Sequence, residues 1–262
     1  MTLAPLIFLV IGAIILHEFG HILTMHRAGI RFKEIGIGYK IPFIPSLSFK
    51  IKWLKNITLK INHLPLGAYI KTFPEDDKKF EEFSYAKQSV ILGAGVLANF
   101  LYGGILLIII PLLSKEPLIK IISDFRFMAT AGALIALALG YKFFCKYMLL
   151  ILGVAAAGLM ALVLIMEPNA TFGNFFAMIP ATKIALSNLQ TAFLAAAGIS
   201  FLLGISNSIP LCPLDGGQLV YFLLGRLENQ KIRKRYKLAS LIIFVALLAL
   251  GCIYVCHVFA SL

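Results

Sequence analysis

Residues 3–25 read LAPLIFLVIGAIILHEFGHILTM, an apolar stretch that carries two histidines and a glutamate near its end. A helix that spans a membrane needs about 20 mainly apolar residues, so this stretch predicts a transmembrane helix. No basic region or small-residue cleavage site precedes it. We therefore expect a retained helix here rather than a cleaved signal peptide.

The rest of the chain has the same character, with 60% hydrophobic and 14% charged residues among 262. An ordinary soluble domain carries about 25% charged residues, so the surplus apolar surface must face lipid. We predict an α-helical polytopic membrane protein with about six transmembrane helices, at residues 3–25, 88–113, 127–141, 147–166, 191–224 and 238–259. The third of these spans is short and contains Gly132 and Gly140. Pro210 and Pro213 should kink or break the fifth span.

The net charge of +12 is distributed unevenly along the chain. Residues 26–87 hold twelve Lys and Arg, residues 225–237 hold six, and Lys142 and Lys146 lie between the third and fourth spans. If these three segments are cytoplasmic, 20 of the 24 basic residues lie inside. This alternation indicates membrane topology rather than a nucleic-acid partner, and it predicts that both termini lie outside.

Between the first two spans the pattern changes to a period of two. Apolar residues alternate with polar ones in 47–53 and again in 57–62, with a polar turn at Lys55 and Asn56. This pattern is typical of strands with one apolar face, and it predicts a small membrane-associated β-sheet within residues 32–71. The alternative is an ordinary amphipathic loop at the membrane surface. Residues 74–79, which are rich in charge, are interpreted as a solvated turn.

His17-Glu18-Phe19-Gly20-His21 lies within the first span. Residues four apart share one face of a helix, so both imidazoles can bind one metal ion, while Glu18 lies about 100° away and can reach a water molecule. Two histidines that hold Zn²⁺ and a glutamate that acts as general base are the zinc-protease arrangement. The alternative, two structural histidines and an accidental glutamate, places costly polar groups in a membrane helix without a function.

A catalytic zinc needs a third protein ligand. Glu34 is the nearest downstream acid, but it lies among Arg31 and Lys33 at the start of the strands. Asp215 is the better candidate, because it is the sole acid in the fifth span and follows two prolines and precedes two glycines. Broken backbone at membrane depth is tolerated where it is buried in protein or lines a watery cavity. His21 and Asp215 should lie roughly 9 Å and at most about 16 Å from the cytoplasmic boundary.

At these residues the chain resembles the site-2 protease family of intramembrane metalloproteases. The resemblance is carried by His17-Glu18-x-x-His21 and by the downstream motif Asn207-x-x-Pro210-x-x-x-Leu214-Asp215-Gly216-Gly217. Residues 64–71 and 93–100 are similar to the β-region and second core helix of the bacterial regulator-of-sigma-E protease branch. Members of that branch usually carry PDZ domains, for which residues 114–189 lack room; an extra helical hairpin and outer loop are expected there instead.

The resemblance implies a role for each motif residue. His17, His21 and Asp215 would bind one zinc ion per chain, and Glu18 would activate water. Asn99 and Asn207 match polar positions that would steady the substrate or the developing oxyanion; an interhelical hydrogen bond is the alternative for each. We expect a single integral membrane domain over 1–262, made of core helices in 1–113, the hairpin and loop in 114–189, and the metal-ligand and last helices in 190–262.

The sequence therefore predicts an intramembrane zinc endopeptidase that cleaves membrane-spanning proteins near the cytoplasmic leaflet, in regulated proteolysis or in clearance of membrane remnants. Its partners would be such substrates and the lipid bilayer, and the resemblance to a bacterial branch implies a bacterial inner membrane. The strands at 47–62 are expected to offer an edge, at 57–62, on which an extended substrate could pair. Two other classes stay open. A catalytically silent scaffold would share the fold, although the complete motifs argue against it. A metal or proton transporter would be expected to show internal repeats and sites near the midplane, and the sequence has no such repeats.

Overall fold

The computed structural model describes residues 3–41, 44–51, 57–113, 125–143, 145, 147, 188–226 and 230–260. The chain divides into two compact units. The first comprises Met1–Lys146 and Asn188–Gly204, and the second comprises Tyr147–Ser187 and Ile205–Leu262. Each is described separately, and whether the chain forms the expected single domain stays a prediction.

The first unit holds most of the apolar helices. They are α1 (Leu3–Arg27), α3 (Tyr85–Leu112), α5 (Phe125–Leu139) and all but the end of α8 (Asn188–Asn207). Within the described residues, α1, α3 and α8 are long and apolar enough to cross a membrane, whereas α5 is shorter. The predicted helical fold, with apolar helices long enough to cross a membrane, is thus confirmed. The count of six spans is not, and the fourth expected span, 147–166, lies almost entirely outside the described residues.

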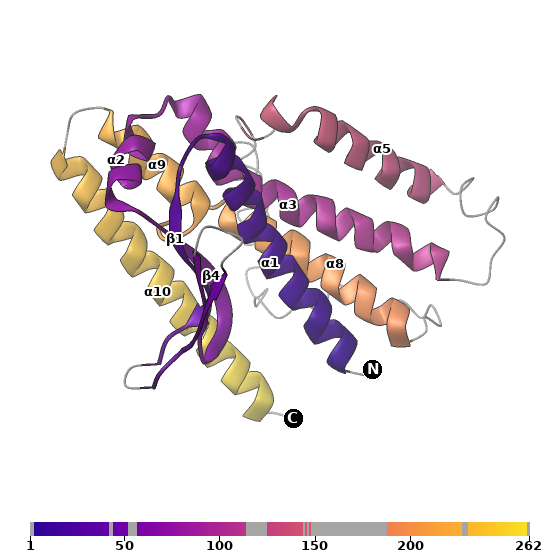
Figure 1. Cartoon of the computed structure of the whole chain (residues 1–262). Coiled ribbons are helices and arrows are strands. Elements are labelled where there is room, and N and C mark those ends of the chain that lie inside the picture. Colours follow the sequence, from indigo (N-terminus) through magenta and orange to yellow (C-terminus); the bar gives the residue numbers. More distant parts are fainter. Residues whose placement is uncertain are drawn as a thin grey trace, which may run out of the picture. The chain divides into compact units, whose positions relative to one another are not determined.

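α3 is the central helix of this unit, and α1, α5 and α8 pack against it (Figure 1). The core between α3 and α8 is formed by Leu106, Ala196 and Ala197. Small residues on α8 allow the helices to approach, as is common where no water is present to drive apolar association. A hydrogen bond from the Ser200 hydroxyl to the Asn99 carbonyl, 2.8 Å long, links the same two helices.

The residues between α1 and α3 in the sequence form a four-stranded sheet with strand order β2-β3-β1-β4. The strands are β1 (Phe32–Tyr39), β2 (Leu47–Ile51), β3 (Ile57–Ile61) and β4 (Leu64–Thr72). β2 and β3 form the antiparallel pair that the alternating residues predict, which confirms the β-region. β1 pairs with β3 in parallel and with β4 in antiparallel orientation.

The position of β3 corrects one expectation about this sheet. The segment 57–62 was expected to present an edge on which an extended peptide could pair. β3 is instead an interior strand, because β2 occupies one side and β1 the other. The two edge strands of the sheet are β2 and β4.

The structure corrects a second expectation, that residues 74–79 form a solvated turn. They instead begin a helix, α2 (Pro74–Glu82). Proline suits the first helical position, and the acidic residues of the first turn interact favourably with the helix dipole. The buried Asp76 carboxylate also accepts a 2.8 Å hydrogen bond from Arg31 Nε, which attaches α2 to the segment that follows α1.

The second unit includes the last residues of α8, and it confirms the predicted break in the fifth span. α8 ends at Asn207, α9 (Asp215–Gly225) follows, and the intervening segment contains the cis peptide bond Cys212–Pro213. α10 (Gln230–Ala260) packs against α9. The Tyr236 hydroxyl of α10 lies 2.9 Å from the Pro210 carbonyl oxygen and 3.2 Å from that of Gly217. It therefore joins the two sides of the break.

Candidate metal centre

Two histidines on α1 form the centre of the site. His17 and His21 lie one helical turn apart, and both side chains are buried, with 8% and 6% of their surface exposed. Their Nε2 atoms are 3.2 Å apart. Two Zn–N bonds of 2.0–2.1 Å at a tetrahedral angle place the two nitrogens about 3.3 Å apart. The spacing of the imidazoles therefore fits a shared zinc ion.

The ring orientation of His21 is fixed from α3. Its Nδ1 atom lies 2.8 Å from the carbonyl oxygen of Ile91. A carbonyl can only accept, so Nδ1 carries the proton and donates it. In the neutral ring the lone pair is then on Nε2, the atom that faces His17. A backbone carbonyl bonded to the distal nitrogen is the usual partner of a histidine that ligates a metal.

His17 also has a partner on α3. Its Nδ1 atom lies 3.0 Å from the amide Nδ2 of Asn99, whose side chain is fully buried. Asn99 Oδ1 has no hydrogen-bond partner within the described part of the chain. A 180° rotation of the amide places this oxygen at Nδ1, so that His17 Nδ1–H donates to it. The amide oxygen of Asn99 then has a partner, and the Nε2 lone pair of His17 points toward His21.

Glycine at position 95 creates the space in which the imidazole nitrogens meet. A β-carbon at this position would lie 2.8 Å from His17 Nε2 and would overlap His21 Nε2. Gly20 of α1 likewise abuts the Ala94 carbonyl, where a side chain would overlap the backbone of α3. α1 and α3 can therefore approach closely enough for α3 to contact both imidazole rings.

The acid of the first motif, Glu18, is half-buried on α1 beside His17. At 100° from its neighbour around the helix, it does not share the face of the two ligand candidates. A carboxylate that does not ligate the metal could act as general base, and this role of Glu18 stays a prediction.

Asp215 belongs to the second unit and is the first residue of α9, where its side chain is buried. Its neighbours are held tightly, because a β-carbon at Gly216 or Gly217 would overlap the backbone of residues 208–212. Asn207, at the end of α8, is half-buried in the same unit. Their roles as zinc ligand and substrate contact stay predictions.

The model of peptidase family M50 matches residues 5–251 of the chain. This chain belongs to peptidase family M50. The protein of Neisseria meningitidis serogroup A named "Putative zinc metalloprotease NMA0084" is 26% identical over 107 residues, which cover 37% of this chain and 23% of that protein. The chain thus matches less than a quarter of this relative's length.

Membership of the M50 family agrees with the donor set on α1, and it supports zinc as the metal of this protein. The family match covers both His17-Glu18-x-x-His21 on α1 and the segment that contains Asp215. The expected resemblance to the site-2 proteases is therefore confirmed, together with the assignment as a membrane metalloprotease at the level of the family.

Glu34, the alternative third ligand, has other partners in the sheet. Its carboxylate lies 2.6 Å from Lys60 Nζ and 3.1 Å from Lys71 Nζ, and it accepts a 2.8 Å hydrogen bond from the Tyr69 hydroxyl. Burial alone raises the pKa of Glu34, but the hydrogen bonds from Lys60, Tyr69 and Lys71 outweigh it and lower the pKa to about 2. The carboxylate of Glu34 already pairs with Lys60 and Lys71, which argues against a role as metal ligand.

Three contributors to this site were not predicted as such from the sequence. They are the Ile91 carbonyl, Gly95, and Asn99 in its contact with His17. The run Gly93-Ala94-Gly95 is a signal that could have indicated a close helix contact, because small residues mark helix interfaces in membranes. A backbone carbonyl carries no such signal, since every residue has one.

Proposed function

We propose that this chain is a zinc endopeptidase that hydrolyses peptide bonds of membrane-spanning proteins near the cytoplasmic leaflet. Such cleavage would serve regulated intramembrane proteolysis or the clearance of membrane remnants. The observation that carries the proposal is the pair of buried imidazoles in a membrane-spanning helix, with Nε2 atoms 3.2 Å apart and the Nδ1 atom of His21 bonded to a carbonyl. Polar groups in such surroundings indicate a functional site.

His17, His21 and Asp215 are proposed to hold one zinc ion. When bound, zinc lowers the pKa of water to about 7 and polarises the carbonyl of the scissile bond. Glu18 accepts the proton of the attacking water and donates it to the leaving amine. Support for Asp215 comes from its chemistry as a carboxylate, its burial at the start of α9, and the tight backbone around it.

The two asparagines are proposed to have different roles. Because Asn99 contacts Nδ1 of His17, its amide is placed to orient this ring rather than to meet the substrate. Asn207 remains the proposed contact for the substrate or the oxyanion. An extended substrate would be aligned by pairing with a free edge of the sheet, at β2 or β4.

We propose that the chain lies in a bacterial inner membrane, and the distribution of basic residues supports both termini outside and the active site toward the cytoplasm. In that topology α2 and the start of α10 are cytoplasmic. Single cysteines at Lys78 and Lys231, both exposed, should react with a membrane-impermeant thiol reagent only from the cytoplasmic side. Labelling from the outside would reverse the orientation.

The test of the catalytic proposal combines metal analysis with cleavage of a single-span reporter by the full chain in lipid vesicles. Wild-type protein should contain about one zinc per chain and cleave the reporter. Glu18→Gln should keep the zinc and lose cleavage, because an amide cannot accept the proton of water. Glu82→Gln, at an exposed position of α2, is the matched control and should change neither. Cleavage that persists after complete removal of zinc would overturn the proposal.

A further inference from the structure

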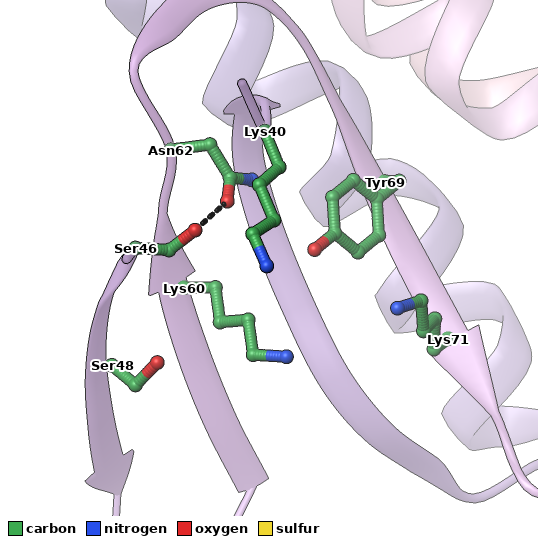
Figure 2. A pocket seen from close by; sticks show the side chains of 7 residues that line it. All are labelled: Lys40, Ser46, Ser48, Lys60, Asn62, Tyr69 and Lys71. Atoms are coloured by element: carbon green, nitrogen blue, oxygen red, sulfur yellow. Dashed lines mark hydrogen bonds between the residues drawn. The ribbon is translucent and has the colours of Figure 1, made fainter. Parts of the chain in front are cut away.

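A pocket of about 560 Å³ lies on one face of the sheet, in the first unit and apart from the histidine pair (Figure 2). It is lined by polar side chains from every strand except β1 and from the segments next to the strands. These residues are Lys40, Ser46, Ser48, Lys60, Asn62, Tyr69 and Lys71. None of the lining residues is acidic, and three of them are lysines.

Strand register explains why these side chains converge. Ser48 is opposite Lys60, Lys60 is opposite Gly36, and Gly36 is opposite Tyr69, so the four positions form one row across the sheet. Gly36 contributes no side chain, and a β-carbon there would overlap the Tyr69 ring. The floor of the pocket is therefore backbone, with Tyr69 lying over it and polar groups on either side.

The charge of the pocket is preorganised and positive. The buried carboxylate of Glu34 lies against Lys60 and Lys71, which fixes the position of both ammonium groups. An ammonium has three N–H donors, so donors of both lysines remain after this contact. Lys40 adds a third ammonium beside the pocket (Figure 2). One carboxylate against three ammonium groups leaves an excess of positive charge.

On the other face of the sheet, β2 and the end of β3 expose apolar side chains. Leu47, Phe49 and Ile61 have 62%, 52% and 41% of their surface exposed. In a membrane protein such a face lies against the acyl chains, in the way that an amphipathic helix lies in the interface. The polar face of the sheet, with its pocket, is then at the level of the lipid headgroups, where phosphate is the abundant anion.

We propose that this pocket is a phosphate-binding site, occupied by the headgroup of an anionic phospholipid or by a soluble phosphate compound of the same chemistry. A phosphate offers several acceptor oxygens and negative charge to a lining that is rich in donors and ammonium groups. The volume is in the range of small-molecule sites, about 300–1,000 Å³, which suits a headgroup better than a single ion. The proposal does not depend on the protease assignment.

The test measures binding of short-chain phosphatidylglycerol, below its micelle concentration, to the full chain in neutral detergent. Glycerol phosphate and inorganic phosphate are measured in parallel, and short-chain phosphatidylcholine serves as the zwitterionic control. Saturable binding of phosphatidylglycerol alone identifies a lipid headgroup as the source. Equal binding of glycerol phosphate identifies a soluble phosphate compound. Absence of saturable binding by all three anions overturns the proposal.

Charge variants distinguish a site from general surface attraction. Lys40→Gln removes an exposed pocket lysine and should weaken binding about five-fold, the loss expected for one basic contact to an anionic headgroup. Lys50→Gln removes an exposed lysine of β2 outside the pocket, in register with Thr58, and should change binding less than two-fold. Equal losses for the two variants would mean diffuse attraction to the basic surface and would contradict a phosphate site.

Discussion

Replacement of Gly95 by alanine tests the metal centre most directly, because it adds one methyl group where the two imidazoles meet. The new β-carbon would lie 2.8 Å from Nε2 of His17 and would overlap Nε2 of His21. Contacts of a β-carbon below 3.0 Å are essentially never seen, so the rings must move apart. Their movement is restricted, because Ile91 and Asn99 hold the Nδ1 atoms.

The expected loss in zinc affinity follows from this geometry. Zinc needs both Nε2 atoms within 2.0–2.1 Å, and a methyl group in the same space prevents that. Altering groups around metal ligands typically costs 10–100-fold in affinity. Direct obstruction should reach at least the upper value, about 100-fold or about 2.8 kcal/mol. The helix itself should form normally, because alanine is more favourable than glycine in a helix by about 0.5–1 kcal/mol.

The assay is a zinc titration of the purified chain against a competing chelator, with circular dichroism to verify helix content. Gly198→Ala is the matched control, since a β-carbon at this position of α8 meets no atom within 4 Å. It should leave zinc affinity unchanged and raise the thermal stability slightly. If Gly95→Ala binds zinc as tightly as the wild type, then the proposed metal position between the two Nε2 atoms is wrong.

Four further variants have defined outcomes. Asp215→Ala should lose most of the zinc by metal analysis, and full retention would exclude it as a ligand. Asn99→Leu should weaken zinc binding about 10–100-fold in the same titration, because His17 loses the partner of its Nδ1 atom. Tyr236→Phe removes the hydroxyl between Pro210 and Gly217 and should weaken zinc binding about ten-fold, if Asp215 is a ligand. Glu34→Gln should abolish an acid-dependent loss of stability, which thermal unfolding can measure. Because the folded protein lowers the pKa of Glu34, the ionised carboxylate stabilises the wild type fully above pH 4.5. About 3 kcal/mol of the free energy of unfolding is lost as the pH falls toward 2.

The long apolar helices and the strands at 47–51 and 57–61 could be predicted from the sequence, because they follow from apolar runs and local periodicity, whereas the charged helix α2 was taken for a turn. The break before Asp215 was also predictable, since Pro210 and Pro213 cannot continue a regular helix. The order of strands could not be derived in this way. The parallel pairing of β1 with β3 brings together residues far apart in the sequence, and alternation alone does not choose a partner.

In the candidate site, too, local features could be predicted from the sequence and contacts between distant segments could not. His17, Glu18 and His21 are evident because their spacing is local to one helix turn. Partners on α3 are not evident, because the contact between α1 and α3 depends on the packing of two helices separated by the whole sheet. The resemblance to a known family singled out Asn99, but only the structure shows that its amide lies against His17.

An asparagine at position 99 is suited to a histidine that changes its tautomer. The positions of the heavy atoms admit two arrangements of protons along the row of Asn99, His17, His21 and the Ile91 carbonyl. In one, Asn99 donates to His17 Nδ1, and His17 Nε2–H donates to His21 Nε2. In the other, His17 Nδ1–H donates to the amide oxygen, and both Nε2 atoms carry a lone pair that could bind zinc. A side-chain amide can satisfy both arrangements by a 180° rotation, whereas leucine satisfies neither and a carboxylate only the second. Asn99→Asp should therefore retain zinc binding far better than Asn99→Leu, and equal losses in the zinc titration would contradict this role of the amide.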